Sequence, residues 1–274
     1  VNPSTNLMIQ KGIVSQELYR GDLIKTGAGT LTFEGDNGNM GSFQGLIDVK
    51  QGTLRVAGDN PGAGAGTSSI FGSNISWADG TVMRSGTNLM LQMGNANGGG
   101  DWNFEEFITF EGNNFVTVGT LGAAVRPMNW NGPIAMNGTT TFEIVPGQIF
   151  RFNTGGGFIQ GNGDIVKDGQ GTLEFRENIP DWKGGLSILQ GRTLLVNQGD
   201  AMGSGNRIAF TPTLQNPAPA AGTGSFIDGN VFTNTKFITL GSNQSQGVAE
   251  LLIQPDLGTA GSVWEVNHPI NVVY

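Results

Sequence analysis

The chain has 274 residues, of which 46 are glycine and none is cysteine, and its formal net charge is −8. Its glycines follow no G-X-Y period, which excludes collagen, and its apolar content of 37% excludes a disordered chain. No window of about 18 apolar residues predicts a membrane helix. The acidic balance, without any Lys/Arg cluster, argues against nucleic acid or anionic lipid as a partner.

Taken in chain order, the sequence shows short alternations of apolar and polar residues separated by Gly, Asn and Asp. Alternation of this kind predicts half-buried strands joined by tight turns, and no stretch has a sustained helical period. The expected strands include 31–33, 54–56, 89–91, 107–110, 115–118, 142–144, 149–152, 208–210, 237–240, 251–253 and 263–266. Strands this short, at a spacing of about ten residues, suit a sandwich, a barrel or a solenoid.

One stretch of the chain occurs twice, and this repeat favours the solenoid. Residues 25–33 read KTGAGTLTF and residues 167–175 read KDGQGTLEF, so Lys, both Gly, Thr, Leu and Phe keep their places. Each copy is followed by an aromatic-x-Gly and by a second glycine-led strand, within 46–56 and 186–196. A recurring strand–turn–strand unit predicts stacked coils. We therefore expect an all-β chain that forms a parallel β-solenoid of about twelve coils.

The glycines of the repeat are expected to form the corners of this solenoid. The paired glycines would turn the chain sharply between two sheet faces, and the glycine before the next strand would do the same. These positions are Gly27, Gly29, Gly52, Gly169, Gly171 and Gly191. The apolar residues that follow the pairs are expected to point into the core, namely Leu31, Phe33, Leu173 and Phe175.

The chain is predicted to be one continuous solenoid over residues 1–274, built by an internal duplication. Module one covers 1–160 and module two covers 161–274, with the join near 155–163. Four segments of low complexity are expected to be lateral loops of the solenoid, not linkers. They are 57–66, 94–100, 197–205 and 212–224.

The repeat resembles a known family. The pattern over 24–56 looks like the autotransporter-associated β-strand repeat, and 166–196 is similar to it, including its aromatic-x-Gly at Trp182-Lys183-Gly184. The second copy has a shorter middle, carries Ile179-Pro180-Asp181 in place of an Asn-rich turn, and inserts Arg192. The direct matches cover these two stretches, whereas the intervening segments share only the general character of the repeat.

The resemblance implies a right-handed parallel β-helix in a secreted or surface-displayed bacterial protein. It also implies a role in display, adhesion or matrix building. The sequence stops at the apolar strand 271–274, with nothing after it to cap the solenoid. We expect either that the chain is part of a longer polypeptide or that this open end stacks on another copy by strand addition.

An enzymatic β-helix would need paired carboxylates, or Asp clusters that bind Ca²⁺ beside a basic residue, on neighbouring coils. The densest acidic groups are Asp101-Glu105-Glu106 and Glu174-Glu177-Asp181. The first group flanks Trp102 and Phe104, which suggests a sugar platform. A solvated turn beside aromatic residues that pack inward is the favoured interpretation.

Other candidate sites are weaker. His268 has no second histidine and no cysteine to join it, so we expect an ordinary edge residue. Residues 161–164 and 36–39 resemble calcium loops but lack the complete ligand pattern. Five tryptophans are spread along the chain, which favours stacking in the core over glycan binding; they are Trp77, Trp102, Trp130, Trp182 and Trp264.

The sequence thus predicts a non-enzymatic extracellular structural protein of a bacterial surface. It would be a stalk, a coat or a filament-forming subunit that associates end to end, with no catalytic residue, cofactor or metal ligand assigned. The first alternative is an adhesin or glycan-binding segment, whose partner would be a host or matrix glycan or protein. The second is a polysaccharide-cleaving enzyme. Neither nucleic-acid binding nor membrane insertion is expected.

Overall fold

The computed structural model describes residues 6–9, 21–34, 45–58, 76–94, 101–121, 127–152, 159–176 and 181–195, together with six strands between 207 and 273. Apart from one 3₁₀ turn, η1 (Trp77–Asp79), the regular elements in these ranges are all strands. Within the same ranges, no helix has the length and apolar character needed to cross a membrane.

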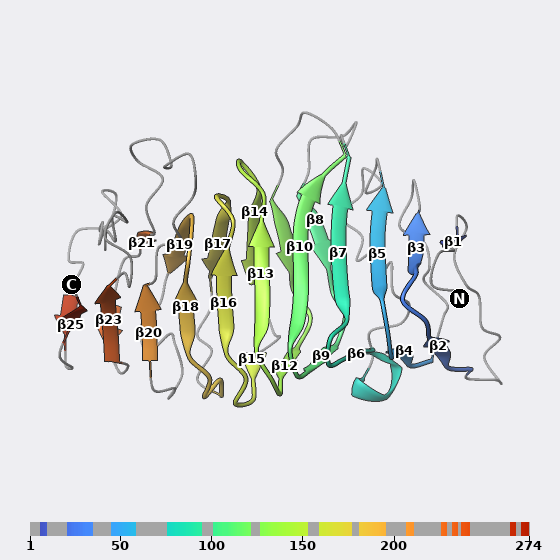
Figure 1. Cartoon of the computed structure of the whole chain (residues 1–274), viewed down its shortest axis with the longest axis horizontal. Helices are drawn as coiled ribbons and strands as arrows, with labels where there is room; N and C mark the ends of the chain where they lie inside the picture. Colours follow the sequence, from blue (N-terminus) through green and yellow to red (C-terminus); the bar gives the residue numbers. More distant parts are fainter. Residues whose placement is uncertain are drawn as a thin grey trace.

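The largest sheet, sheet A, contains eleven strands whose neighbours all pair in parallel. In spatial order they are β1 (Leu7–Ile9), β3 (Thr30–Glu34), β5 (Thr53–Gly58), β7 (Asn88–Met93), β10 (Asn114–Thr120), β13 (Thr140–Ile144), β16 (Ile165–Asp168), β18 (Leu186–Ile188), β20 (Arg207–Phe210), β23 (Phe237–Gly241) and β25 (Ile270–Val273). Figure 1 shows these strands side by side along the long axis of the molecule, from the N-terminal to the C-terminal end.

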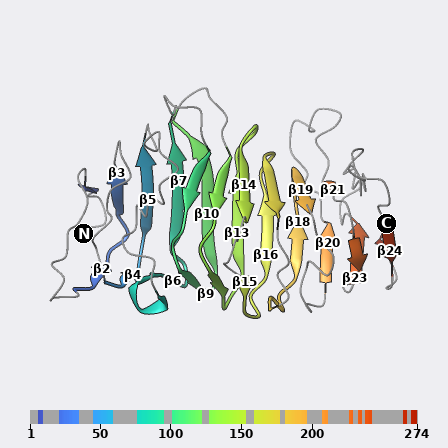
Figure 2. The same cartoon turned by 180° about the vertical axis from the view of Figure 1, so that it is seen from behind.

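Two six-stranded sheets form the other sides of the solenoid, and Figure 2 shows the molecule from behind. Sheet B contains β2 (Leu23–Lys25), β4 (Ile47–Val49), β6 (Thr81–Arg84), β9 (Ile108–Glu111), β12 (Ile134–Met136) and β15 (Ile159–Gln160). Sheet C contains β8 (Trp102–Phe104), β11 (Met128–Trp130), β14 (Ile149–Phe152), β17 (Thr172–Phe175), β19 (Arg192–Leu195) and β21 (Phe226–Asp228). A separate pair joins β22 (Phe232–Asn234) to β24 (Trp264–Val266).

Each complete coil passes through sheet B, then sheet A, then sheet C, and the strands of one sheet in successive coils stack in parallel. The predicted all-β parallel solenoid is therefore confirmed. The described part of the chain makes about five turns, four of which have a described strand in all three sheets, and the expected count of twelve coils is not confirmed. The right-handed sense of the coil and the division into two modules stay predictions, although sheets A and C both continue across residue 160.

The strand predictions differ from the structure mainly at their ends. The strand expected at 107–110 is β9, at 108–111, because Phe107 belongs to the corner where Trp77 packs edge-on against it. The strand expected at 263–266 is observed at 264–266, and the one expected at 251–253 lies outside the described residues.

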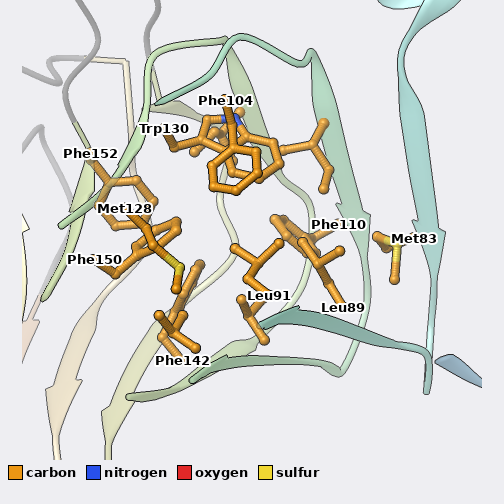
Figure 3. Packing of buried hydrophobic residues seen from close by; sticks show 14 of the residues in the cluster. Met83, Leu89, Leu91, Phe104, Phe110, Met128, Trp130, Phe142, Phe150 and Phe152 are labelled. Atoms are coloured by element: carbon orange, nitrogen blue, oxygen red, sulfur yellow. The ribbon is translucent and has the colours of Figure 1, made fainter. Parts of the chain in front are cut away.

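The core runs along the inside of the solenoid and is rich in aromatic residues. The rings of Phe104 and Trp130 stack with their centroids 5.4 Å apart, as Figure 3 shows. A second row passes from Phe150 to Phe152 and then to Phe175, with centroid distances of 5.2 and 5.0 Å. Because each ring contacts residues of the neighbouring coil, burial of these side chains stabilises the stacking of coils as well as each coil.

The residues that were expected to point inward do so. Leu31, Phe33, Leu173 and Phe175 are at most 2% exposed. Three of the five tryptophans are equally buried, namely Trp102, Trp130 and Trp182, which confirms the core interpretation for these three. Trp77 is partly buried against Phe107.

Candidate functional site

The repeated motif forms a corner that is held from inside by a lysine. Lys25 ends β2, and its side chain turns into the solenoid, where the residue is only 2% exposed. Its Nζ donates hydrogen bonds to the carbonyl of Gly27 in the same corner, at 2.6 Å, and to that of Gln51 in the corner of the next coil, at 2.7 Å. The ammonium group therefore satisfies buried carbonyls of two successive coils at once.

The second copy repeats this arrangement. Lys167 is fully buried, and its Nζ donates to the carbonyls of Asp168 at 2.8 Å, Gly169 at 2.6 Å and Gln190 at 3.0 Å. Burial lowers the pKa of Lys167 to about 7, while the charge of Asp168 acts in the opposite direction. Burial also lowers the pKa of Lys25. We call each set, Lys25 with Gly27, Gln51 and Gly52, and Lys167 with Gly169, Gln190 and Gly191, a lysine-capped corner.

Glycine is required in these corners for two separate reasons. Gly27 and Gly169 have φ angles of 78° and 72°, in the left-handed region that favours glycine. Gly52 has a φ of 75° and also lies directly on the preceding corner, where an added Cβ would be 2.4 Å from the carbonyl oxygen of Gly29. The predicted role of the glycines in turning the chain is confirmed for these three, and for Gly191 with a φ of 72°.

The two lysine-capped corners do not occupy the same side of the solenoid. The corner at Lys25 joins sheet B to sheet A, because β2 belongs to sheet B and β3 to sheet A. Lys167 lies in β16 of sheet A and leads to β17 of sheet C. The motif therefore specifies a strand–corner–strand unit, and not a particular side of the coil.

The outer face of sheet C carries a charged ladder, defined here as Asp101, Asn129, Arg151, Glu174 and Arg176. The Nη1 atom of Arg151 donates to Asp101 at 2.8 Å, and its Nε donates to Glu174 at 2.7 Å. Arg176 donates to the second oxygen of Glu174 at 2.5 Å. The Nδ2 atom of Asn129 reaches Asp101 at 3.3 Å. These bonds join residues up to 50 positions apart and link β11, β14 and β17 to Asp101, which directly precedes β8.

A similar but more exposed network lies on sheet B. Arg84 donates to Asp48 at 2.8 Å through Nε and to Glu111 at 2.6 Å through Nη1, so it bridges three coils. The side chain of Arg84 is 40% exposed, and that of Asp48 is 9% exposed. Like the charged ladder, this network neutralises carboxylates with a guanidinium group.

One buried carboxyl lies apart from both networks. Glu106 is fully buried at the corner between sheets C and B, and its Oε1 accepts a hydrogen bond from the Thr81 hydroxyl at 2.8 Å. Its Oε2 has no hydrogen-bond partner among the described residues. Burial raises the pKa of Glu106 to about 8, against the effect of Thr81 and with a further increase from Asp79. The side chain is therefore mainly neutral at pH 7.

The structure brings together one residue from each predicted acidic group, and both are paired. Asp101 and Glu174 bind the same guanidinium, Arg151. Glu105 is partly buried, Asp181 is exposed, and Glu177 lies outside the described residues. Trp102 and Phe104 are 2% and 1% exposed, so the sugar platform suggested for them is wrong and their inward packing is confirmed.

The remaining candidates add no site. Asp164 of the predicted calcium-like loop accepts a hydrogen bond from the amide of Gly185 at 2.6 Å. His268 and residues 36–39 lie outside the described part of the chain. Among the residues that the structure describes, no group of three His, Cys, Asp or Glu side chains is arranged to hold a metal ion.

Sequence reasoning missed Arg151 and the two buried lysines as interacting residues. The alternation Ile149-Phe150-Arg151-Phe152 signals that Arg151 points outward, between two buried rings. It does not indicate that Asp101 lies next to it. The lysines belong to the repeated motif, but the motif alone does not indicate that their side chains point inward.

Comparison with known proteins supports the repeat. Residues 23–56 match a family model described as the passenger-associated-transport-repeat. This stretch coincides with the first lysine-capped corner and the coil that follows it, which confirms the resemblance to autotransporter-associated β-strand repeats for this part of the chain. The searches of curated proteins and of solved structures gave no significant match.

Proposed function

We propose that this chain, which carries a passenger-associated transport repeat, is a non-enzymatic structural segment of a bacterial protein that is secreted or displayed on the cell surface. The repeat is similar to those of passenger domains, which act outside the cell. As such a segment, the solenoid would serve as a stalk or coat that holds other parts of the protein at a distance.

The observation that carries this proposal is the use of charged side chains to hold coils together. Lys25 and Lys167 each bind carbonyls of two successive coils. Arg84 and Arg151 each join carboxylates from coils before and after their own. Bonds that cross from coil to coil resist separation of the coils along the rod, which is the property that a spacer requires.

The same contacts favour a structural role over acid–base catalysis. Glycan cleavage needs one carboxyl group that gives up its proton and another that is free to attack or to activate water. Asp101 and Glu174 are instead held by Arg151, and Glu174 is held by Arg176 as well. The oxygens of both carboxylates accept hydrogen bonds from guanidinium groups, so this pair is suited to joining strands.

Labelling of intact cells tests the proposed location. An antibody raised against the purified chain should bind unbroken cells of the source bacterium or the medium around them, and protease added outside should remove the signal. A cytoplasmic protein probed in the same samples should stay protected. Signal that appears only after lysis would overturn the proposal.

We also propose that copies associate end to end through the edge of sheet A. Among the described strands, β25 lies at one edge of this sheet and pairs with β23, and a strand edge can bind another strand by backbone hydrogen bonds. Electron microscopy of the purified chain should then show filaments, and Val272→Lys with Val273→Glu should shorten them. Filaments that keep their length in this variant would rule out this joint.

A further inference from the structure

The outer face of sheet A carries an exposed aromatic residue. Phe115 on β10 is 52% exposed, although the residues before and after it, Asn114 and Val116, are buried. Its neighbours in the same outward row are Asn88 on β7 and Thr141 on β13. Neither is charged, so Phe115 is an exposed apolar side chain between uncharged neighbours.

The next outward row places opposite charges on either side of this centre. In the order of the strands it contains Arg55, Met90, Thr117, Glu143 and Asp168, which are in register across β5, β7, β10, β13 and β16. Arg55 donates to Gln92 at 2.7 Å. Glu143 is exposed, and its side chain makes no hydrogen bond or ion pair with the other described residues. The row is therefore positive two strands before Thr117 and negative one strand after it.

We propose that this face binds a second copy of the chain, with the two solenoids antiparallel. The pair would be related by a two-fold axis that runs parallel to the strands, between β7 and β10. Such an axis places β7 opposite β10 of the partner subunit, and β5 opposite β13 of the partner subunit. Arg55 then faces Glu143 of the partner subunit, and the symmetry forms this ion pair twice.

The same axis brings the two exposed rings together. Phe115 and the partner's Phe115 lie on strand positions that are next to each other, about 4.8 Å apart along the sheet, in sheets that stack at about 10 Å. Aromatic rings interact favourably at centroid distances of about 4.5–7 Å. An exposed phenylalanine at the centre with ion pairs around it is the usual arrangement of a small interface.

The charges select this orientation against the other face-to-face pairing. A two-fold axis parallel to the solenoid would place each strand opposite itself in the partner. Arg55 would then face the partner's Arg55, and Glu143 would face the partner's Glu143. Like charges at these positions repel, so the antiparallel pair is preferred. This inference deepens the proposed structural role by adding lateral association, but its test uses only the purified chain.

Charge reversal tests the pairing. The natural chain should sediment as a dimer at low salt and dissociate as salt is added. Arg55→Glu and Glu143→Arg should each weaken the dimer about tenfold or more, and the double variant should restore it because the pair is re-formed with its charges exchanged. Lys183→Glu, an exposed position on another side of the molecule, is the matched control and should leave the dimer unchanged.

Two further variants make the result independent of charge. Phe115→Ser should weaken the dimer while the circular dichroism spectrum stays unchanged, because the ring is exposed in the single chain. The chain contains no cysteine, so Asn88→Cys should be cross-linked to its partner by a short bismaleimide, and Lys183→Cys should not.

A natural chain that stays monomeric at its highest soluble concentration would overturn the pairing. A dimer that survives both single charge reversals would also overturn it. A dimer that depends on Val272 and Val273 but not on Phe115 would assign self-association to the solenoid end instead. None of these outcomes bears on whether the chain lies outside the cell, which labelling of intact cells decides separately.

Discussion

Lys25 and Lys167 replace what would otherwise be two apolar residues of the core. Each occupies the inside of a corner where backbone carbonyls of two coils converge. An apolar side chain would fill the same volume but would leave these acceptors without donors, at a cost of about 1–3 kcal/mol for each one left unsatisfied. This is a physical reason for lysine at the start of the repeated motif.

Substitution of this lysine gives the first prediction. Lys167→Met keeps the length of the side chain and removes the donor, so we expect the free energy of unfolding to fall by about 2–4 kcal/mol. Lys183→Met, at an exposed position, should change it by less than about 0.5 kcal/mol. Urea denaturation of the two variants measures this difference. Equal stabilities would mean that the carbonyls do not need the ammonium group.

Glu106 and Lys167 predict opposite dependences of stability on pH. Glu106 has its pKa raised from 4.5 to about 8, so the folded state holds a proton that the unfolded state releases, and stability falls as the pH rises from about 4.5 to about 8. Lys167 has its pKa lowered from 10.5 to about 7, so stability rises again between about pH 7 and pH 10.5.

Variants separate the two effects. Glu106→Gln keeps the shape of the neutral acid and should remove the fall in unfolding free energy below about pH 8. Lys167→Met should reduce the rise above about pH 7, and the rise that remains belongs to Lys25, whose pKa is also lowered by burial. Urea titrations between pH 4.5 and 10 check both. A fall that persists unchanged in Glu106→Gln would assign it to another group.

Gly171 gives a prediction about packing at a corner. An added Cβ would lie 2.4 Å from Cγ2 of Ile144 and 2.5 Å from the carbonyl oxygen of Val145, so Gly171→Val should destabilise the chain by about 3 kcal/mol. Asp168→Ala loses the hydrogen bond from the Gly169 amide, at 2.7 Å, and should cost about 1 kcal/mol. Thermal melting compares the two variants. Equal melting temperatures would show that the corner can relax around a side chain.

At the scale of the strand and the corner, one motif serves two different sides of the solenoid. The hydrogen bond from Thr53 to Gly29 in the first copy corresponds to that from Arg192 to Gly171 in the second, and both are 3.2 Å long. The local geometry is thus repeated although the sheets differ. A strand–corner–strand unit can be placed on any side, because it packs mainly on the coil before it and the coil after it.

The charged ladder gives a prediction at the same scale. Arg151→Met removes the cationic partner of Asp101 and one cationic partner of Glu174, whose side chain is only 4% exposed, so we expect the free energy of unfolding to fall by about 2–3 kcal/mol. Arg84→Met breaks a comparable network in which the arginine is 40% exposed, and should cost about 1 kcal/mol or less. Urea denaturation measures both. A larger loss of unfolding free energy in Arg84→Met than in Arg151→Met would mean that burial does not determine how much these ion pairs stabilise the fold.

At the scale of the whole molecule, the solenoid consists of coils that contact their nearest neighbours. The three sheets and the aromatic core continue through its centre without a break. Stability is then a sum of contributions from each coil and each contact between coils, so a local break need not unfold the distant coils.

A substitution at the centre of the solenoid tests whether distant coils stay folded when two neighbouring coils are separated. An added Cβ at Gly132 would lie 2.1 Å from the carbonyl oxygen of Glu106, so Gly132→Val should separate two neighbouring coils. Hydrogen exchange should become faster in β8, β9, β11 and β12, while β16 to β19 keep their protection. Equal loss of protection along the whole chain would show that the solenoid unfolds as one cooperative unit.

The fold class and the positions of the glycine corners could be predicted from the sequence alone. An alternating pattern requires that Leu31 and Phe33 share a face, and a turn with positive φ requires glycine at Gly27 and Gly169. These are local properties, since they depend on residues within about ten positions of one another. Both copies of the repeat contain the alternating pattern and the glycine turn, which is why the solenoid could be predicted from the repeat.

Contacts between side chains of different coils are seen only in the tertiary structure. The meeting of Arg151 with Asp101, 50 residues away, follows from the length of two coils between them, and this length depends on loops that show no pattern in the sequence. Glu106 is buried although Glu105 beside it is only partly so, because the corner packs under Trp130, whose Nε1 donates to the Glu106 carbonyl at 3.0 Å. Local patterns fix conformation, whereas contacts between coils depend on the path of the whole chain.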